Sequence, residues 1–275
     1  MNKYKEVYVN DVNEFYIKFK EGRHFSTIKF YNESNYHKLL SDLYNKKTKD
    51  YIDWLIIGEI LLLTYQKENE IPKIVSKIKK VKDSRVYNYL YKIYNRGFGV
   101  KHNLKVAMEY LKKAVDLNDA IACYNLWASY YNGFIDIENP LSFLEKAAEL
   151  EDPISQELLG NYYDEQGFAV KAKYWWQRAK QNGNNHSKLK LILLNLEDFN
   201  YEINPKTIIY EMISLAESGN INSQVELAIK FLEGVDVKQN IGYAFNWFNV
   251  AAKNGSEKSK KYLNKYFGFE YGGKI

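Results

Sequence analysis

A local pattern that recurs five times constrains this chain more than any other feature of its sequence. Each copy reads as an apolar helix ending near Gly, a short loop, and a second helix closing on small or apolar residues. The closing positions are spaced by 33, 32, 36 and 36 residues and are Ala114, Ala147, Ala179, Leu215 and Ala251. One helix pair cannot bury its apolar face alone and packs on its neighbours, so such a period is typical of solenoids. The sequence therefore predicts an all-α solenoid of antiparallel helix pairs.

The loops inside the pairs carry signals that end one helix and start the next. Residues 97–103 (GFGVKHN) correspond to residues 234–240 (GVDVKQN). Each loop opens on a Gly, which accepts the positive φ of a helix end without a Cβ penalty. Each closes on an Asn, a favoured N-cap residue. We expect Asn103 and Asn240 to cap the second helices of their pairs.

The second helices also share an aromatic position four residues before the closing residue. These helices are expected over residues 104–115, 170–180 and 241–252. Four residues is a helix-face spacing, so Tyr110, Trp175 and Trp247 are predicted to lie in the core. Trp176 lies about 100° further round the helix and is expected to be partly exposed.

From about residue 84 to 267 the chain resembles the Sel1-like repeat family, which is related to tetratricopeptide repeats. The motifs that carry the resemblance are Ala120-x-Ala122-x-x-Asn125-Leu126, Gly97-x-Gly99-Val100, Lys171-Ala172-x-x-Trp175 and Ala251-Ala252-x-x-Gly255. The resemblance implies a right-handed α-solenoid whose first helices line a concave, protein-binding face. The family's Gly after the Leu of the first helix is present as Gly160 but replaced by Tyr91 and Trp127. These two side chains are expected to widen the packing or to project into the groove.

The patterns divide the chain into four expected parts. Residues 84–255 hold Sel1-like repeats, and residues 51–83 form a degenerate helical repeat whose apolar stretch reads as a buried helix. Residues 256–275 are expected to form a C-terminal capping helix and tail. Residues 1–50 are expected to form an N-terminal helical cap region. Two helices separated by Gly22 would make it a helical hairpin. Strand alternation over residues 15–19 and 27–31 fits nearly as well and is the alternative to the preferred helices.

The N-terminal sequence, the apolar segments and the cysteine content predict a cytoplasmic protein. The N-terminus has no apolar stretch of signal-peptide length. The longest apolar segment, residues 54–65, has 12 residues, whereas a bilayer span needs about 20. The single cysteine, Cys123, cannot form an internal disulfide and fits a reducing compartment; it reads as a small buried helix residue. We expect no membrane segment, and the bacterial source follows from the family resemblance.

No set of residues in the sequence has the pattern of a catalytic or metal site. The four His residues lie at least 13 positions apart, and neither H-E-x-x-H nor C-x-x-C occurs. Gly97-x-Gly99 lacks the third Gly of a dinucleotide site. We therefore expect no catalytic residues, no metal, no cofactor and no enzymatic activity.

Charge is distributed unevenly along the chain. Residues 1–120 hold 23 Lys and Arg against 15 Asp and Glu, whereas residues 121–275 hold 16 against 19. A basic N-terminal half could steer an acidic partner or bind nucleic acid. Nucleic-acid binding ranks below protein binding, because the basic residues are interspersed with acids and no nucleic-acid motif is present.

The first helices supply the candidate partner-binding residues. These are Tyr87, Asn88, Tyr91, Asn95, Tyr124, Trp127 and Tyr131. Aromatic side chains on such a face are frequent binding hot spots. The family resemblance implies two kinds of protein partner: a toxin that this chain neutralises as an immunity protein, or the components joined by a signalling or secretion adaptor. The sequence leaves the partner and the oligomeric state open.

Overall fold

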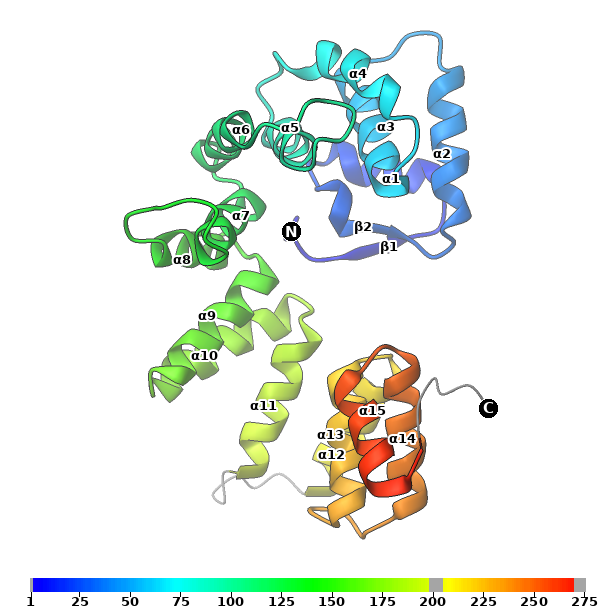
Figure 1. The fold of residues 1–275 in the computed structure, drawn as a ribbon, viewed down its shortest axis with the longest axis vertical. Coiled ribbons are helices and arrows are strands. Elements are labelled where there is room, and N and C mark those ends of the chain that lie inside the picture. Colours follow the sequence, from blue (N-terminus) through cyan, green and yellow to red (C-terminus); the bar gives the residue numbers. More distant parts are fainter. Residues whose placement is uncertain (1, 198–204, 270–275) are drawn as a thin grey trace. The chain divides into compact units, whose positions relative to one another are not determined.

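A computed structural model describes residues 2–197 and 205–269, in two compact units, Met1–Phe168 and Ala169–Ile275 (Figure 1). Apart from one pair of three-residue strands, the regular elements of these described residues are helices. The prediction of an all-α fold built from helix pairs is confirmed. The boundary between the units falls inside the predicted repeat region, after the helix that ends at Glu165.

The first unit opens with a small cap that mixes helices and strands. Its elements are β1 (Val7–Val9), α1 (Val12–Lys20), η1 (Phe25–Thr27), β2 (Ile28–Phe30) and α2 (Ser34–Asn45). β1 and β2 pair in parallel, with Val7 opposite Ile28. The helix expected after Gly22 is wrong: the alternation of buried Ile28 and Phe30 with half-buried Lys29 places a strand there.

Helix α3 (Tyr51–Thr64) forms the centre of the first unit's N-terminal core. Every residue from Leu55 to Leu62 is buried, which confirms the buried helix predicted for this stretch. Gly58 permits a close helix contact, because a Cβ there would lie 2.6 Å from the ring of Tyr89. The turn η2 (Glu68–Glu70) and helix α4 (Ile71–Ile78) follow and complete this core.

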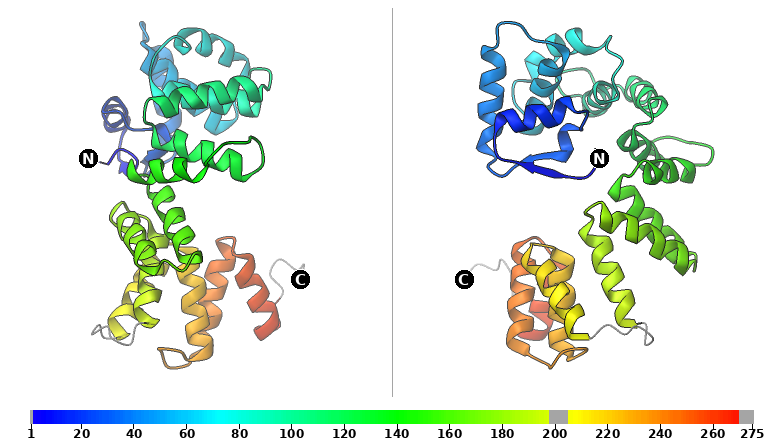
Figure 2. Two further views of the ribbon diagram at one scale, coloured as in Figure 1. Left: turned by 90° about the vertical axis from the view of Figure 1, so that its left-hand side faces the viewer. Right: turned by 180° about the vertical axis from the view of Figure 1, so that it is seen from behind.

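The repeats of the first unit stack in sequence order, each helix packing on the next (Figures 1 and 2). They comprise α5 (Ser84–Arg96), α6 (Leu104–Asp116), α7 (Ala120–Tyr131), α8 (Leu141–Glu149) and α9 (Pro153–Glu165). The predicted loop signals are confirmed. Gly97 ends α5 with φ 71°, and the side chain of Asn103 accepts a hydrogen bond from the Val106 N–H at 3.1 Å.

The five closing positions that define the period share one backbone hydrogen bond. Each closing carbonyl accepts from the N–H five residues later, and the residue before that donor has a positive φ, as in a Schellman motif. The donors then cap the next first helix and are Asp119, Asp152, Asn184, Asn220 and Ser256. One linker thus ends a second helix and starts the following first helix, which explains why the period is readable in the sequence.

The second unit holds six helices among its described residues. They are α10 (Ala169–Gln181), α11 (Asn185–Glu197), α12 (Pro205–Glu217), α13 (Ile221–Glu233), α14 (Ile241–Lys253) and α15 (Glu257–Phe267). Gly234 ends α13 with φ 75°, and the Asn240 side chain accepts from the Tyr243 N–H at 3.0 Å. Both follow the predicted loop signals.

The predicted core aromatics of the second unit are wrong by one residue. Trp176 is 3% exposed and Phe248 is fully buried, whereas their neighbours Trp175 and Trp247 are only half-buried. One residue turns a side chain about 100° round the helix, so the small-residue alignment put the wrong aromatic toward the core. Tyr110, the third predicted anchor, is half-buried and packs on the N-terminal core.

Candidate interaction surface

A pocket of about 310 Å³ opens on the first-helix side of the first unit. Helices α3, α5 and α7 border it, together with η1 from the N-terminal cap. The residues that line it are His24, Phe25, Ser26, Glu59, Asn88, Tyr91, Lys92, Asn95, Arg96, Ile121 and Asn125. The first helices therefore do not present a bare face, because the cap supplies one wall of the pocket.

The structure brings three of the predicted binding residues into this pocket. Tyr91 and Asn95 are half-buried and line it on successive turns of α5. Asn88 also lines the pocket but is 4% exposed and donates from Nδ2 to Asp119 at 2.9 Å. Tyr87 does not line it; its ring lies 6.2 Å from that of Tyr110.

The other three predicted residues form an aromatic stack along α7. The ring centroids of Tyr124 and Trp127 lie 5.9 Å apart, and those of Trp127 and Tyr131 lie 5.3 Å apart. Exposure rises along the stack from half-buried Tyr124 to Tyr131, which is 76% exposed. An aromatic row of this kind offers a large contact area to a partner, with Tyr131 as its exposed end.

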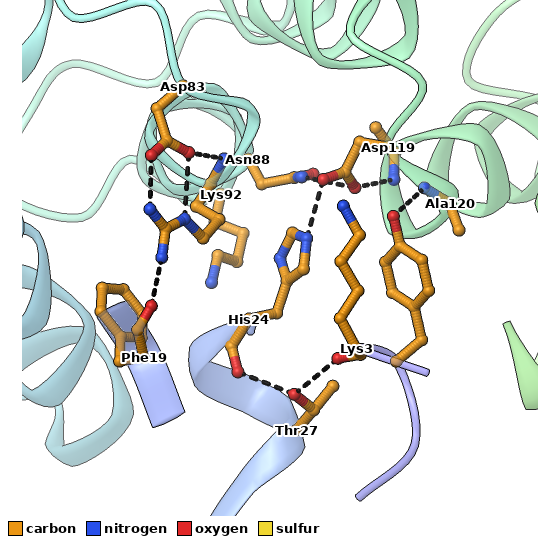
Figure 3. Close-up of polar contacts among 12 residues, drawn as sticks. Lys3, Phe19, His24, Thr27, Asp83, Asn88, Lys92, Asp119 and Ala120 are labelled. Atoms are coloured by element: carbon orange, nitrogen blue, oxygen red, sulfur yellow. Dashed lines mark hydrogen bonds and ion pairs between the residues drawn. The ribbon is translucent and has the colours of Figure 1, made fainter. Parts of the chain in front are cut away.

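A buried polar cluster fixes the cap against the first helices (Figure 3). His24 Nε2 lies 2.7 Å from Asp119 Oδ2, and both side chains are buried. Asp119 also accepts a hydrogen bond from the Ala122 N–H at 3.0 Å. The N-cap residue of α7 is therefore also the residue that pairs with His24 of the N-terminal region. In the sequence, the four His residues were considered only as metal ligands, so the pairing of His24 with Asp119 was not predicted. The sequence feature that relates to this pairing is the Asp at the N-cap position of α7.

Further contacts of the N-terminal segment reinforce the same docking. The Tyr4 hydroxyl accepts from the Ala120 N–H at 3.0 Å, and Asn2 Nδ2 donates to the Glu151 carbonyl at 2.9 Å. Tyr4 stacks on the His24 ring at 5.7 Å between centroids. The segment thus spans the start of α7 and the linker before α9.

The two buried aspartates of these linkers have opposite pKa shifts. Burial opposes ionisation of Asp119, but the charge and hydrogen bond of His24 outweigh it and lower the pKa of that carboxyl. Burial raises the pKa of Asp152, only partly offset by hydrogen bonds from Ser155, and repulsion from Asp119 raises it further. Asp119 is therefore stabilised as a carboxylate, whereas Asp152 is not.

We expect Asp152→Asn to raise the free energy of unfolding at pH 7 by about 1 kcal/mol, because it removes a buried charge. Asn220 holds the equivalent position and accepts from Ser223 N and Oγ, as Asp152 does from Ser155. A raised native pKa means that the parent loses stability as the pH rises through it. Urea unfolding should therefore show a higher free energy of unfolding for Asp152→Asn than for the parent at pH 7, and no difference at acid pH. A variant that is less stable at pH 7 would show that the charge is needed.

The remaining candidate chemical groups of this region are an ion pair and a buried thiol. Lys92 Nζ contacts both carboxylate oxygens of Glu59 at 2.6 Å. Cys123 is buried, as predicted, and burial raises the pKa of its thiol to about 11. The described residues contain no group of three potential metal ligands, and no described helix has the length and apolarity of a membrane span.

Comparisons with known proteins agree with this architecture. The Sel1 repeat model matches residues 92–119, 153–184 and 221–256. A Sel1 repeat protein from Oxalobacter formigenes superposes with a TM-score of 0.65 at 23% identity, over 79% of this chain and 88% of that one. No curated protein matches the sequence significantly.

Two further solved structures are similar over most of this chain. The protective antigen c5321 of uropathogenic Escherichia coli, which displays an SLR fold, gives a TM-score of 0.59 at 19% identity. The similarity covers 94% of this chain but only 60% of the antigen. The immunity protein Pa5087 from Pseudomonas aeruginosa gives a TM-score of 0.46 at 17% identity, over 86% of this chain and 88% of that one. Three segments of this chain are therefore Sel1 repeats, and the first two of these solved structures share its helical-repeat fold.

Proposed function

We propose that this protein is a non-catalytic interaction module that binds another protein on the first-helix side of its first unit. Sel1 repeat proteins are protein-interaction modules, which supports the general class. The observation that carries the proposal is the aromatic stack of Tyr124, Trp127 and Tyr131 on α7, beside the pocket lined by Tyr91 and Asn95. Asn88 is buried and positions Asp119, so we assign it no direct contact.

The partner itself is the finer part of the proposal. We infer a toxin partner, with this chain as its immunity protein, from the family resemblance; a signalling or secretion adaptor is the alternative. Affinity capture from the native cell, followed by identification of the bound protein, separates the two roles. Recovery of a toxin whose activity the purified chain abolishes supports immunity, and recovery of signalling or secretion components supports an adaptor.

Nucleic-acid binding gains no support from the charges of the first unit. Five of its cations form ion pairs with carboxylates in the described structure: Lys18, Lys46, Lys67, Arg85 and Lys92. Pairing of this kind reduces the positive charge available to phosphates. A salt-sensitive association with RNA or DNA would reverse this ranking.

Replacing Tyr131 by alanine is expected to weaken binding of the captured partner at least tenfold. The side chain is 76% exposed, so its removal should leave the thermal midpoint unchanged while a binding hot spot is lost. Tyr31→Ala is the matched control, because Tyr31 is 71% exposed but lies in the cap after β2. Calorimetric titration of both variants measures the effect. Equal affinities for the two would contradict a binding role for the stack.

A further inference from the structure

The net negative charge of this protein lies in one stretch of the first unit. Residues 121–168 contain one basic residue, Lys146, against nine Asp and Glu. The stretch comprises α7, α8 and α9, and it follows a segment of net positive charge. Partners that approach these helices therefore meet a negative local field.

A second pocket, of about 700 Å³, lies within this stretch and at the adjoining helix α6. Its apolar lining residues are Met108, Val115, Leu126, Ile135, Ile137 and Phe143. Three carboxylates, Asp116, Asp136 and Glu138, line it as well, with Lys112 as the one basic lining residue. The three carboxylates are exposed, and none is within ion-pair distance of a cation among the described residues. We call this cavity the acidic pocket.

The loop that forms one side of the acidic pocket departs from the corresponding loops of other repeats. Residues 97–103 and 234–240 each carry a Lys in this connection, whereas residues 132–140 carry Asp136 and Glu138. The second of those loops does hold an acid, Asp236, but pairs it with Lys230 at 2.6 Å. Phe98 is 4% exposed in its loop, while Phe134 is 65% exposed. This loop alone of the three presents both unpaired acids and a bare aromatic ring.

We propose that the acidic pocket is a docking site for a basic amphipathic segment of a partner protein. An apolar side chain of that segment would enter beside the half-buried Ile135, Ile137 and Phe143. Lys or Arg side chains on either side of it would meet the three rim carboxylates. Contact with the half-buried Ile135, Ile137 and Phe143 supplies the affinity, and charge complementarity supplies the orientation and the association rate.

The charge of the pocket selects this occupant over others. Nucleic acid is disfavoured, because its phosphates would face three carboxylates and one Lys. The acidic pocket shares no lining residue with the pocket on the first-helix side. The inference therefore goes beyond the proposed function, and either one can fail without the other.

The test uses the full-length chain and a short synthetic peptide with alternating faces of Leu and Lys as the probe. Fluorescence anisotropy should show saturable binding, and an otherwise identical peptide with Glu in place of Lys should not bind. The variant Asp116→Asn/Asp136→Asn/Glu138→Gln should weaken binding about tenfold or more. The control variant Glu149→Gln/Asp164→Asn/Glu165→Gln removes the same charge from exposed positions outside the pocket and should change affinity by less than threefold.

Methyl NMR locates the probe independently of affinity. We expect shifts of the Met108, Ile135 and Ile137 methyl groups on addition of the Leu/Lys peptide. Equal weakening in both charge variants, or shifts confined to residues outside the acidic pocket, would overturn the proposal. So would sedimentation showing that the parent chain dimerises through this pocket and that only the pocket variant is monomeric, because a second copy would then be the occupant.

Discussion

Replacing Asp119 by alanine is expected to lower the free energy of unfolding by about 3–5 kcal/mol, the usual cost of breaking a buried ion pair. The substitution removes the acceptor of His24, of Asn88 Nδ2 and of the Ala122 N–H at once. Buried donors left without partners are costly, because water cannot replace the lost acceptor. Urea unfolding of parent and variant measures the loss.

Asn103→Ala provides the control for helix capping alone. Asn103 caps α6 as Asp119 caps α7, but its side chain is exposed and has no buried partner. Loss of such a cap costs about 1 kcal/mol. Similar losses in the two variants would mean that the His24 contact adds nothing to stability.

The contribution of Asp119 also depends on pH, in a direction opposite to that of Asp152. Its native pKa is lowered, so its stabilisation is present above the ordinary Asp pKa of about 3.9 and is lost as the pH falls toward the native pKa. The stability difference between the parent and Asp119→Asn should therefore shrink at acid pH. A difference that grows there would contradict the assignment of a stabilised carboxylate.

Replacing Trp176 by alanine is expected to cost about 3–5 kcal/mol, because a nearly fully buried indole leaves a large cavity. Trp176 lies on the buried face of α10 together with Ala172 and Ala179. The loss should appear in the unfolding of the second unit.

The adjacent residue gives a control of identical chemistry. Trp175 is half-buried, with its ring 5.1 Å from both the Tyr174 ring and the Arg178 guanidinium. Trp175→Ala should therefore cost clearly less than Trp176→Ala in the same urea experiment. A larger loss of unfolding free energy for Trp175→Ala would mean that Trp175 and not Trp176 is the core residue, as the repeat pattern predicted.

Features set by local chemistry could be predicted from the sequence. The helix ends at Gly97 and Gly234 and the caps at Asn103 and Asn240 depend on residues within one turn. The period itself is readable because each closing carbonyl is bound by the N–H of the next cap. These signals were sufficient for the repeat architecture.

Features set by packing could not be predicted in the same way. The choice between Trp175 and Trp176 depends on the rotation of α10, which a motif aligned on small residues fixes only to within one position. The pairing of His24 with Asp119 joins residues far apart in sequence, so no local pattern announces it. The same pairing places the cap beside Tyr91 and Asn95 and turns an expected open face into a pocket.

Hydrogen exchange of the complex with the partner captured from the native cell tests the proposed binding surface most directly. We expect the amides of α5 and α7, which carry Tyr91 and Tyr131, to exchange more slowly in the complex than in the isolated chain. Unchanged exchange along both helices, with protection confined to other elements, would contradict binding on the first-helix side.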